Sequence, residues 1–125
     1  MVYLTTMNQE NLEKTTLIDS REMGEALDSI EIHAPEYAKA KAERIHLDDY
    51  RKVQLALLYE HSEGRTVVER ESWCKAHADY QEVLTEHANA VERETALHWK
   101  LKLAETQIDV WRTIQASRRQ EARIL

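Results

Sequence analysis

The chain has 125 residues, of which 42% are hydrophobic and 32% charged, with only two Gly, one Pro and no Phe. So few helix breakers among so many helix-forming residues argue against a sheet protein and predict an all-α fold. The formal net charge of −6 argues against indiscriminate binding to polyanions, and the single cysteine, Cys74, excludes an internal disulfide and predicts a reducing cytosol.

No membrane span is predicted, because the longest uninterrupted apolar run, Leu55 to Tyr59, is far shorter than the ~20 residues needed to cross a bilayer. Residues 1–18 show no sustained period and are interpreted as an N-terminal arm. The pattern changes at Asp19, which has the spacing of a helix cap with Glu22 and predicts a helix over about 20–33.

Pro35 is expected to end that helix and to open a second one over about 35–62, because proline suits the first turn of a helix. Gly64 then supplies a left-handed cap. Thr66 and Glu69 repeat the capping spacing, so a third helix is expected over about 67–122. These three helices form one predicted domain over 19–125, an elongated helical hairpin with one very long arm.

A seven-residue repeat runs through the long arm, in which sixty residues from Thr66 to Leu125 include no Gly or Pro. At ~1.5 Å per residue such a helix is ~90 Å long, and the rest of the chain looks too short to cover it. The repeat therefore predicts coiled-coil-like packing in a homo-oligomer. The interface residues predicted from it are Trp73, Tyr80, Val83, Leu84, His87, Val91, Leu97, Leu101, Ile108 and Trp111. The alternative is a break capped by Asn89 and Glu92, which would give a compact bundle.

Polar residues interrupt this repeat at His87, Glu94 and His98. They are interpreted as a polar layer that fixes register or oligomeric state, and a helical metal site on the same three residues is the weaker alternative. Cys74 is expected to be a buried small residue rather than a nucleophile. No phosphate-binding loop, nucleophile elbow or zinc-protease motif is present, so neither an enzyme nor a cofactor or metal is predicted.

Basic residues gather at the C-terminal end of the chain. Residues 98–125 carry a net charge of +3, which leaves −9 for residues 1–97. Arg112, Arg119 and Arg123 share a face at helical spacing near Trp111, and a basic face with an aromatic residue is typical of single-stranded nucleic-acid binding. Cations that merely offset the dipole at a helix end are the alternative.

Two segments resemble the UvsY-like recombination mediator proteins of bacteriophages. They are RKVQLALLYEHSEGR (Arg51 to Arg65) and LHWKLKLAETQIDVWRTIQASRR (Leu97 to Arg119), and the resemblance covers roughly 36–123. It implies a ring-forming phage protein that loads a recombinase onto single-stranded DNA and displaces the single-strand-binding protein. The family's basic DNA contacts match Ala56 and Leu58 here, which cannot bind phosphate.

The predicted function is thus an oligomeric phage accessory protein of DNA recombination in the host cytoplasm. Its partners would be single-stranded DNA, a recombinase or a single-strand-binding protein. The alternative is a protein-only helical interaction module, such as a virion assembly factor, a chaperone or an inhibitor. The predicted nucleic-acid contacts are Arg51, Lys52, Arg65, Arg112, Arg118, Arg119 and Arg123.

Overall fold

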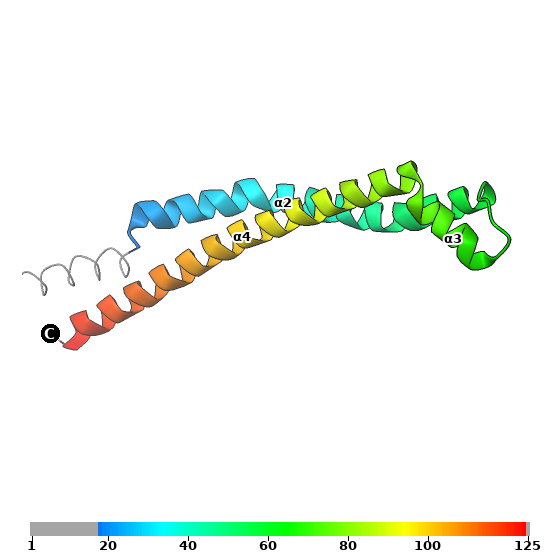
Figure 1. The fold of residues 1–125 in the computed structure, drawn as a ribbon. Helices are drawn as coiled ribbons and strands as arrows, with labels where there is room; N and C mark the ends of the chain where they lie inside the picture. The colour runs from blue at the N-terminus through cyan, green and yellow to red at the C-terminus, as the bar shows by residue number, and fades with distance from the viewer. Residues whose placement is uncertain (1–17, 125) are drawn as a thin grey trace, which may run out of the picture. The chain divides into compact units, whose positions relative to one another are not determined.

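The structure is a computed structural model that describes residues 18–124. This part of the chain forms three α-helices and no strand: α2 (Ser20–Glu60), α3 (Val67–Ala76) and α4 (Ala78–Ile124) (Figure 1). The predicted all-α fold with a long C-terminal helix is confirmed. The predicted N-terminal arm, 1–18, lies outside the described residues except for Ile18.

Two compact units share these helices. Of the described residues, 18–33 and 100–124 belong to one unit, here called the terminal unit, and Ala34–Trp99 form the other, the hairpin unit. Each long helix contributes a segment to both units, and each unit has its own packing, described separately below.

Helix α2 begins where the sequence predicted, since Asp19 Oδ1 accepts a hydrogen bond from the Glu22 backbone N–H at 2.8 Å. It does not end before Pro35, so the predicted boundary between helices 20–33 and 35–62 is wrong. A proline ring leaves the carbonyl four residues earlier without its helical donor. That carbonyl belongs to Glu31, and both residues are exposed, so water can hydrate it.

The turn between α2 and α3 contains Gly64, whose φ of +148° is available to glycine at low cost. Gly64 lies four residues beyond the end of α2, so it shapes the turn rather than directly capping the helix. The predicted cap of the next helix is confirmed, because Thr66 Oγ1 accepts from the Glu69 N–H at 3.2 Å. The Glu69 carboxylate reaches back to the Arg65 N–H at 2.7 Å and holds the turn from the other side.

The predicted single helix over 67–122 is wrong, because the chain leaves the helical conformation at His77 (φ −67°, ψ 140°). The His77 ring takes the role of a cap, since its Nδ1 accepts from the Asp79 N–H at 3.1 Å. The side-chain amide of Gln81 bridges back to the Lys75 carbonyl at 2.6 Å. These side-chain contacts give no signal in hydrophobic periodicity, so the repeat appeared to run from Trp73 into α4 without interruption.

Helix α4 continues through Asn89, and the alternative break there is excluded. Its buried and half-buried residues follow the predicted repeat, with Tyr80, Val83, Ala90 and Leu97 buried in the hairpin unit. Leu84, His87 and Glu94 are half-buried, whereas Val91 is 37% exposed. The seven-residue spacing therefore identified the packed face of α4 correctly.

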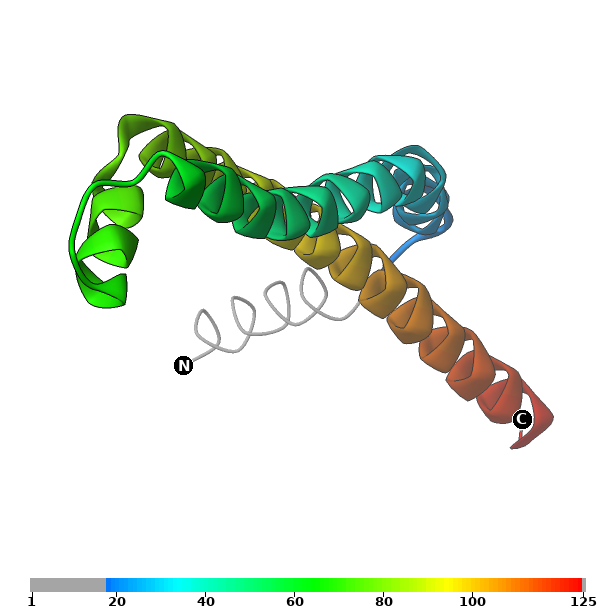
Figure 2. The same cartoon turned by 90° about the vertical axis from the view of Figure 1, so that its right-hand side faces the viewer.

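In the hairpin unit, α2 packs antiparallel to α4, with α3 beside the end where the chain turns (Figures 1 and 2). Leu58 of α2, Cys74 of α3 and Tyr80 of α4 form a buried cluster. The half-buried residues packed against this cluster are Leu55, Tyr59, Trp73 and Leu84. Cys74 is 1% exposed, as predicted for a small buried residue.

The terminal unit has a smaller cluster, in which Ala26 of α2 meets Ala104 and Ile108 of α4, with Ile30 packed beside them. Leu101 and Trp111 are half-buried here. Two of the three buried residues in this cluster are alanines, so the cluster buries little apolar volume.

The residues predicted to contact another copy thus pack largely within their own chain. The expectation that the chain was too short to cover its long helix is wrong, because α2 has 41 residues and continues through Pro35. Homo-oligomerisation itself stays a prediction.

Candidate functional site

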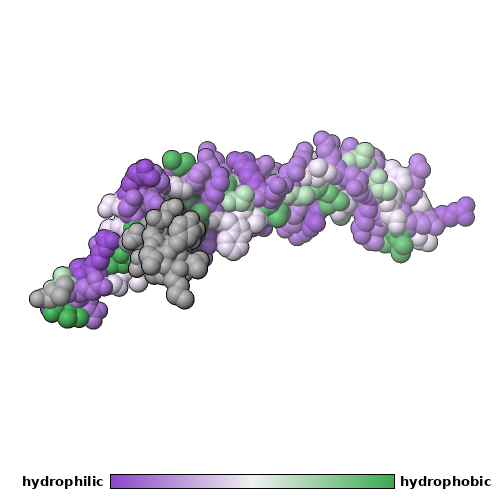
Figure 3. Space-filling view, turned by 60° about the vertical axis from the view of Figure 1, so that its left-hand side comes forward, coloured by the Kyte–Doolittle hydropathy of each residue, from purple (hydrophilic) through white to green (hydrophobic). Residues whose placement is uncertain are grey.

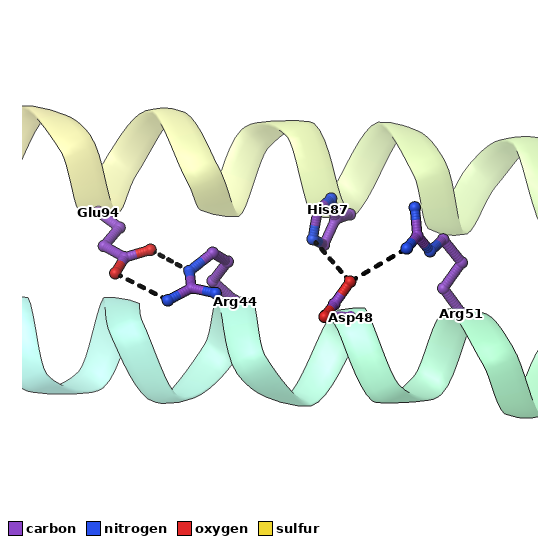
Figure 4. A network of polar contacts seen from close by, with 5 residues as sticks. All are labelled: Arg44, Asp48, Arg51, His87 and Glu94. Atoms are coloured by element: carbon purple, nitrogen blue, oxygen red, sulfur yellow. Dashed lines mark hydrogen bonds and ion pairs between the residues drawn. The ribbon is translucent and has the colours of Figure 1, made fainter.

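A charged layer crosses the hairpin unit between α2 and α4. The guanidinium of Arg44 forms a bidentate ion pair with the Glu94 carboxylate: Nε donates to Oε2, and Nη2 donates to Oε1 at 3.2 Å (Figure 4). The side chains are 32% and 14% exposed, so the pair is partly shielded from water. Its hydrogen bond to Glu94 raises the pKa of Arg44 above its ordinary value.

One helical turn away, Asp48 lies between two basic groups. Its Oδ1 is 3.1 Å from Arg51 Nη2 on the same helix and 3.7 Å from His87 Nε2 on α4 (Figure 4). Asp48 is half-buried in this contact, whereas its neighbour Asp49 is exposed. A further pair, Arg93 with Glu43 at 3.5 Å, lies on the exposed edge of the layer.

The predicted polar layer therefore exists, with His87 and Glu94 in it, but α2 of the same chain completes it. His98 is outside the layer, because its exposed ring contacts Tyr37 and Trp99 at centroid distances of 6.2 and 5.4 Å. Residues 18–124 contain no group of three His, Cys, Asp or Glu that could hold a metal ion. Arg44 occupies the carboxylate that the alternative metal site would have needed.

The pair of Arg44 and Glu94 can be tested by reversing one charge. Arg44→Glu or Glu94→Arg should lower the thermal unfolding midpoint, because two like charges then face each other in a contact that is partly shielded from water. The double reversal should recover most of that loss, since it restores the pair. Circular dichroism melts of the four proteins measure this coupling. If the two losses simply add, Arg44 and Glu94 do not interact.

Sequence reasoning missed Arg44 and Asp48. For Arg44 the signal was present, because the residues of α2 that pack inward also repeat every seven positions; Asp48 is not part of that repeat. One series is Ile30, Tyr37, Arg44, Arg51 and Leu58; the other is Ala26, His33, Ala40, Leu47 and Gln54. The presumed break at Pro35 divided these series into two short helices and hid the repeat.

The predicted nucleic-acid contacts in the hairpin unit differ in their availability. Arg51 is half-buried and paired with Asp48. Lys52 is exposed on α2, and Arg65 is exposed in the turn before α3. Of these three cations, only Lys52 and Arg65 are presented to solvent without an ion pair among the described residues.

The predicted contacts in the terminal unit are more uniform. Arg112, Arg118, Arg119 and Arg123 are all exposed on α4, and none forms an ion pair within residues 18–124. Arg112, Arg119 and Arg123 lie seven and four residues apart, which places them on one face at rises of ~10 and ~6 Å. Arg119 and Arg123 also line a recess of about 410 Å³ with Ala116, Gln120 and Ile124.

Comparisons of the chain with models of protein families, with curated proteins and with solved structures found no match. Among the described helices, none combines the length and the apolar character needed to span a bilayer.

Proposed function

We propose that this protein is an oligomeric accessory factor of DNA recombination, of phage origin, that binds single-stranded DNA through the arginines at the end of α4. In this role it acts beside a recombinase or a single-strand-binding protein. The resemblance of Arg51 to Arg65 and Leu97 to Arg119 to recombination mediators suggests the process. The distribution of free and paired cations suggests which end of the chain meets the nucleic acid.

One observation carries the proposal: four of the six arginines between 18 and 111 are held in ion pairs, whereas the four arginines at the C-terminal end of α4 form none among residues 18–124. Arg21 pairs with Glu25, Arg44 with Glu94, Arg51 with Asp48 and Arg93 with Glu43. Arg44 and Arg51, whose pairs are partly shielded, would have to leave a carboxylate behind to bind a phosphate, whereas the exposed pairs of Arg21 and Arg93 hold their arginines only weakly. The four exposed arginines near the end of α4 carry no such cost.

A single strand suits this face better than a duplex groove. The arginines form a line along one helix, and a flexible strand can follow it with successive phosphates. Two or three phosphate contacts give weak binding on their own, so an oligomer would gain affinity by presenting several such ends to one strand.

The test is the fluorescence anisotropy of a labelled single-stranded oligonucleotide titrated at several salt concentrations. Changing Arg119 and Arg123 to Ala should lower the slope of log affinity against log salt by ~1.4, because each phosphate contact contributes ~0.7 for single strands. The matched control changes Arg21 and Arg93 to Ala, which removes the same charge from paired positions, and its slope should stay close to that of the wild type.

A flat titration at low salt, together with no binding to a recombinase or single-strand-binding protein, would refute the proposal. Equal losses in both double variants would show a net-charge effect rather than a site.

The second candidate function is a helical interaction module that binds proteins only. Its support is the charge of −9 on residues 1–97 and the exposure of large apolar side chains in the hairpin unit. It predicts that changing Arg112, Arg118, Arg119 and Arg123 together to Ala leaves partner binding intact.

A further inference from the structure

Helix α2 has two apolar faces within the hairpin unit. One packs inward, with Ala40, Leu47 and Leu58 between 1% and 8% exposed. The other is turned outward, with Ile45, Val53 and Leu57 between 45% and 51% exposed. A helix that only had to pair with α4 would need one apolar face, so the second face requires its own explanation.

The outward residues form a stripe rather than a scatter. Ile45, Val53 and Leu57 are eight and four residues apart, which is helical spacing, and the exposed Ala38, Ala42 and Ala56 continue the same side. We call these six residues the outer stripe. Hydrophobic side chains also reach the surface between hydrophilic ones in the space-filling view (Figure 3). Single exposed apolar residues are ordinary, but a register of this length is typical of a helix-binding surface.

Free lysines border the outer stripe. Lys39, Lys41 and Lys52 are exposed and form no ion pair among residues 18–124. On the side of α2 that bears the outer stripe, Asp49 and Glu60 are exposed and likewise unpaired among the described residues. The other charges between 38 and 57 cancel in the pairs of the charged layer. In a chain of net charge −6, this side of α2 therefore carries a small positive excess, three free lysines against two free carboxylates.

The apolar stripe and the lysines beside it together indicate which kind of molecule binds here. Nucleic acid is a poor match for Ile45, Val53 and Leu57, because its backbone is charged and its bases stack on aromatic rather than aliphatic side chains. A second copy paired antiparallel about a two-fold axis would set the edge that bears Lys41 and Lys52 against the same edge of its partner. A parallel pair would set it against the opposite edge, which bears Lys39, so like charges oppose both pairings. An amphipathic helix with carboxylates beside its apolar seam satisfies both the stripe and the lysines.

We propose that the outer stripe of α2 is a docking site for an acidic amphipathic helix of another protein. The site is separate from the arginines of α4, so it stands or falls independently of DNA binding. Leu57 and Val53 are buried by the apolar seam of the partner, and Lys41 and Lys52 meet its Asp and Glu side chains.

The experiment uses the full-length protein and two labelled synthetic helical peptides of ~20 residues, long enough to be helical when bound. Both carry Leu at helical spacing; one has Glu on the flanks and the other has Lys. The Glu peptide should bind saturably and the Lys peptide at least ~10-fold more weakly, because the lysines of the site repel it.

Two variants locate the binding. Changing Ile45, Val53 and Leu57 to Gln, a good helix former, should lower the affinity for the Glu peptide by ~10-fold or more. The matched control changes Val67 and Val68 to Gln, which are 60% and 71% exposed on α3, and should bind as the wild type does. If the stripe variant loses helicity by circular dichroism, the exposed pair Lys41→Glu and Lys52→Glu tests the same site, and it should reverse the preference between the two peptides.

The proposal is overturned if the Glu peptide does not bind, if both peptides bind equally, or if the stripe and charge variants keep the wild-type affinity. It is also overturned if sedimentation shows a wild-type dimer that the stripe variant converts to a monomer, because the occupant is then a second copy. The same stripe variant should retain single-stranded DNA affinity, so a failure here and a failure of DNA binding are distinguishable.

Discussion

Replacing Leu58 by Ala is expected to lower the free energy of unfolding by ~2–4 kcal/mol, a typical cost of removing a buried leucine side chain from a core. Leu58 is 8% exposed and forms the buried cluster of the hairpin unit with Cys74 and Tyr80, so its loss leaves a cavity where three helices meet. Urea unfolding followed by circular dichroism measures the change.

The adjacent leucine is the matched control. Leu57 is 51% exposed on the outer stripe, and Leu57→Ala should cost less than ~1 kcal/mol, because Ala is also a good helix former and little buried area is lost. Both variants remove the same atoms from neighbouring positions of one helix. Equal costs, or a larger cost for Leu57→Ala, would mean that the inward face of α2 has been assigned incorrectly.

Replacing Pro35 by Ala is expected to stabilise the protein, by ~2 kcal/mol. Proline inside a helix costs ~3 kcal/mol relative to alanine, and its stiffening of the unfolded chain returns up to ~1 kcal/mol of that. Pro35 is exposed, so an alanine there disturbs no packing.

The sign of this change in stability distinguishes a continuous α2 from two helices that meet at Pro35. If Pro35 instead opened a second helix, it would occupy a favourable position, and Pro35→Ala would be neutral or destabilising. Gly24→Ala calibrates the measurement, because a Cβ at Gly24 meets nothing within 4 Å and the change should add ~1 kcal/mol through helix propensity alone. A loss of stability in Pro35→Ala with the normal gain in Gly24→Ala would contradict the continuous helix.

Local chemistry made several features predictable. Asp19 and Thr66 cap the helices that the sequence assigned to them, and the seven-residue spacing from Tyr80 to Ile108 marks the buried face of α4. Each of these signals depends only on residues within a few turns of one another. The exposed arginines of the C-terminal end were also apparent, because an uncompensated run of charge is visible in the order of residues.

The sequence by itself determined the helical class, the capped helix starts and the inward face of α4, because these follow from short-range spacing. Only the tertiary structure decided that α2 continues through Pro35 and that His77 divides the long helix. It also decided that Arg44 pairs with Glu94 and that Asp48 lies against His87. Packing and side-chain contacts on either side of these positions outweigh the local preferences that the sequence displays. For the same reason, the repeat on α4 showed that a partner was needed, whereas only the folded chain showed that the partner is its own α2.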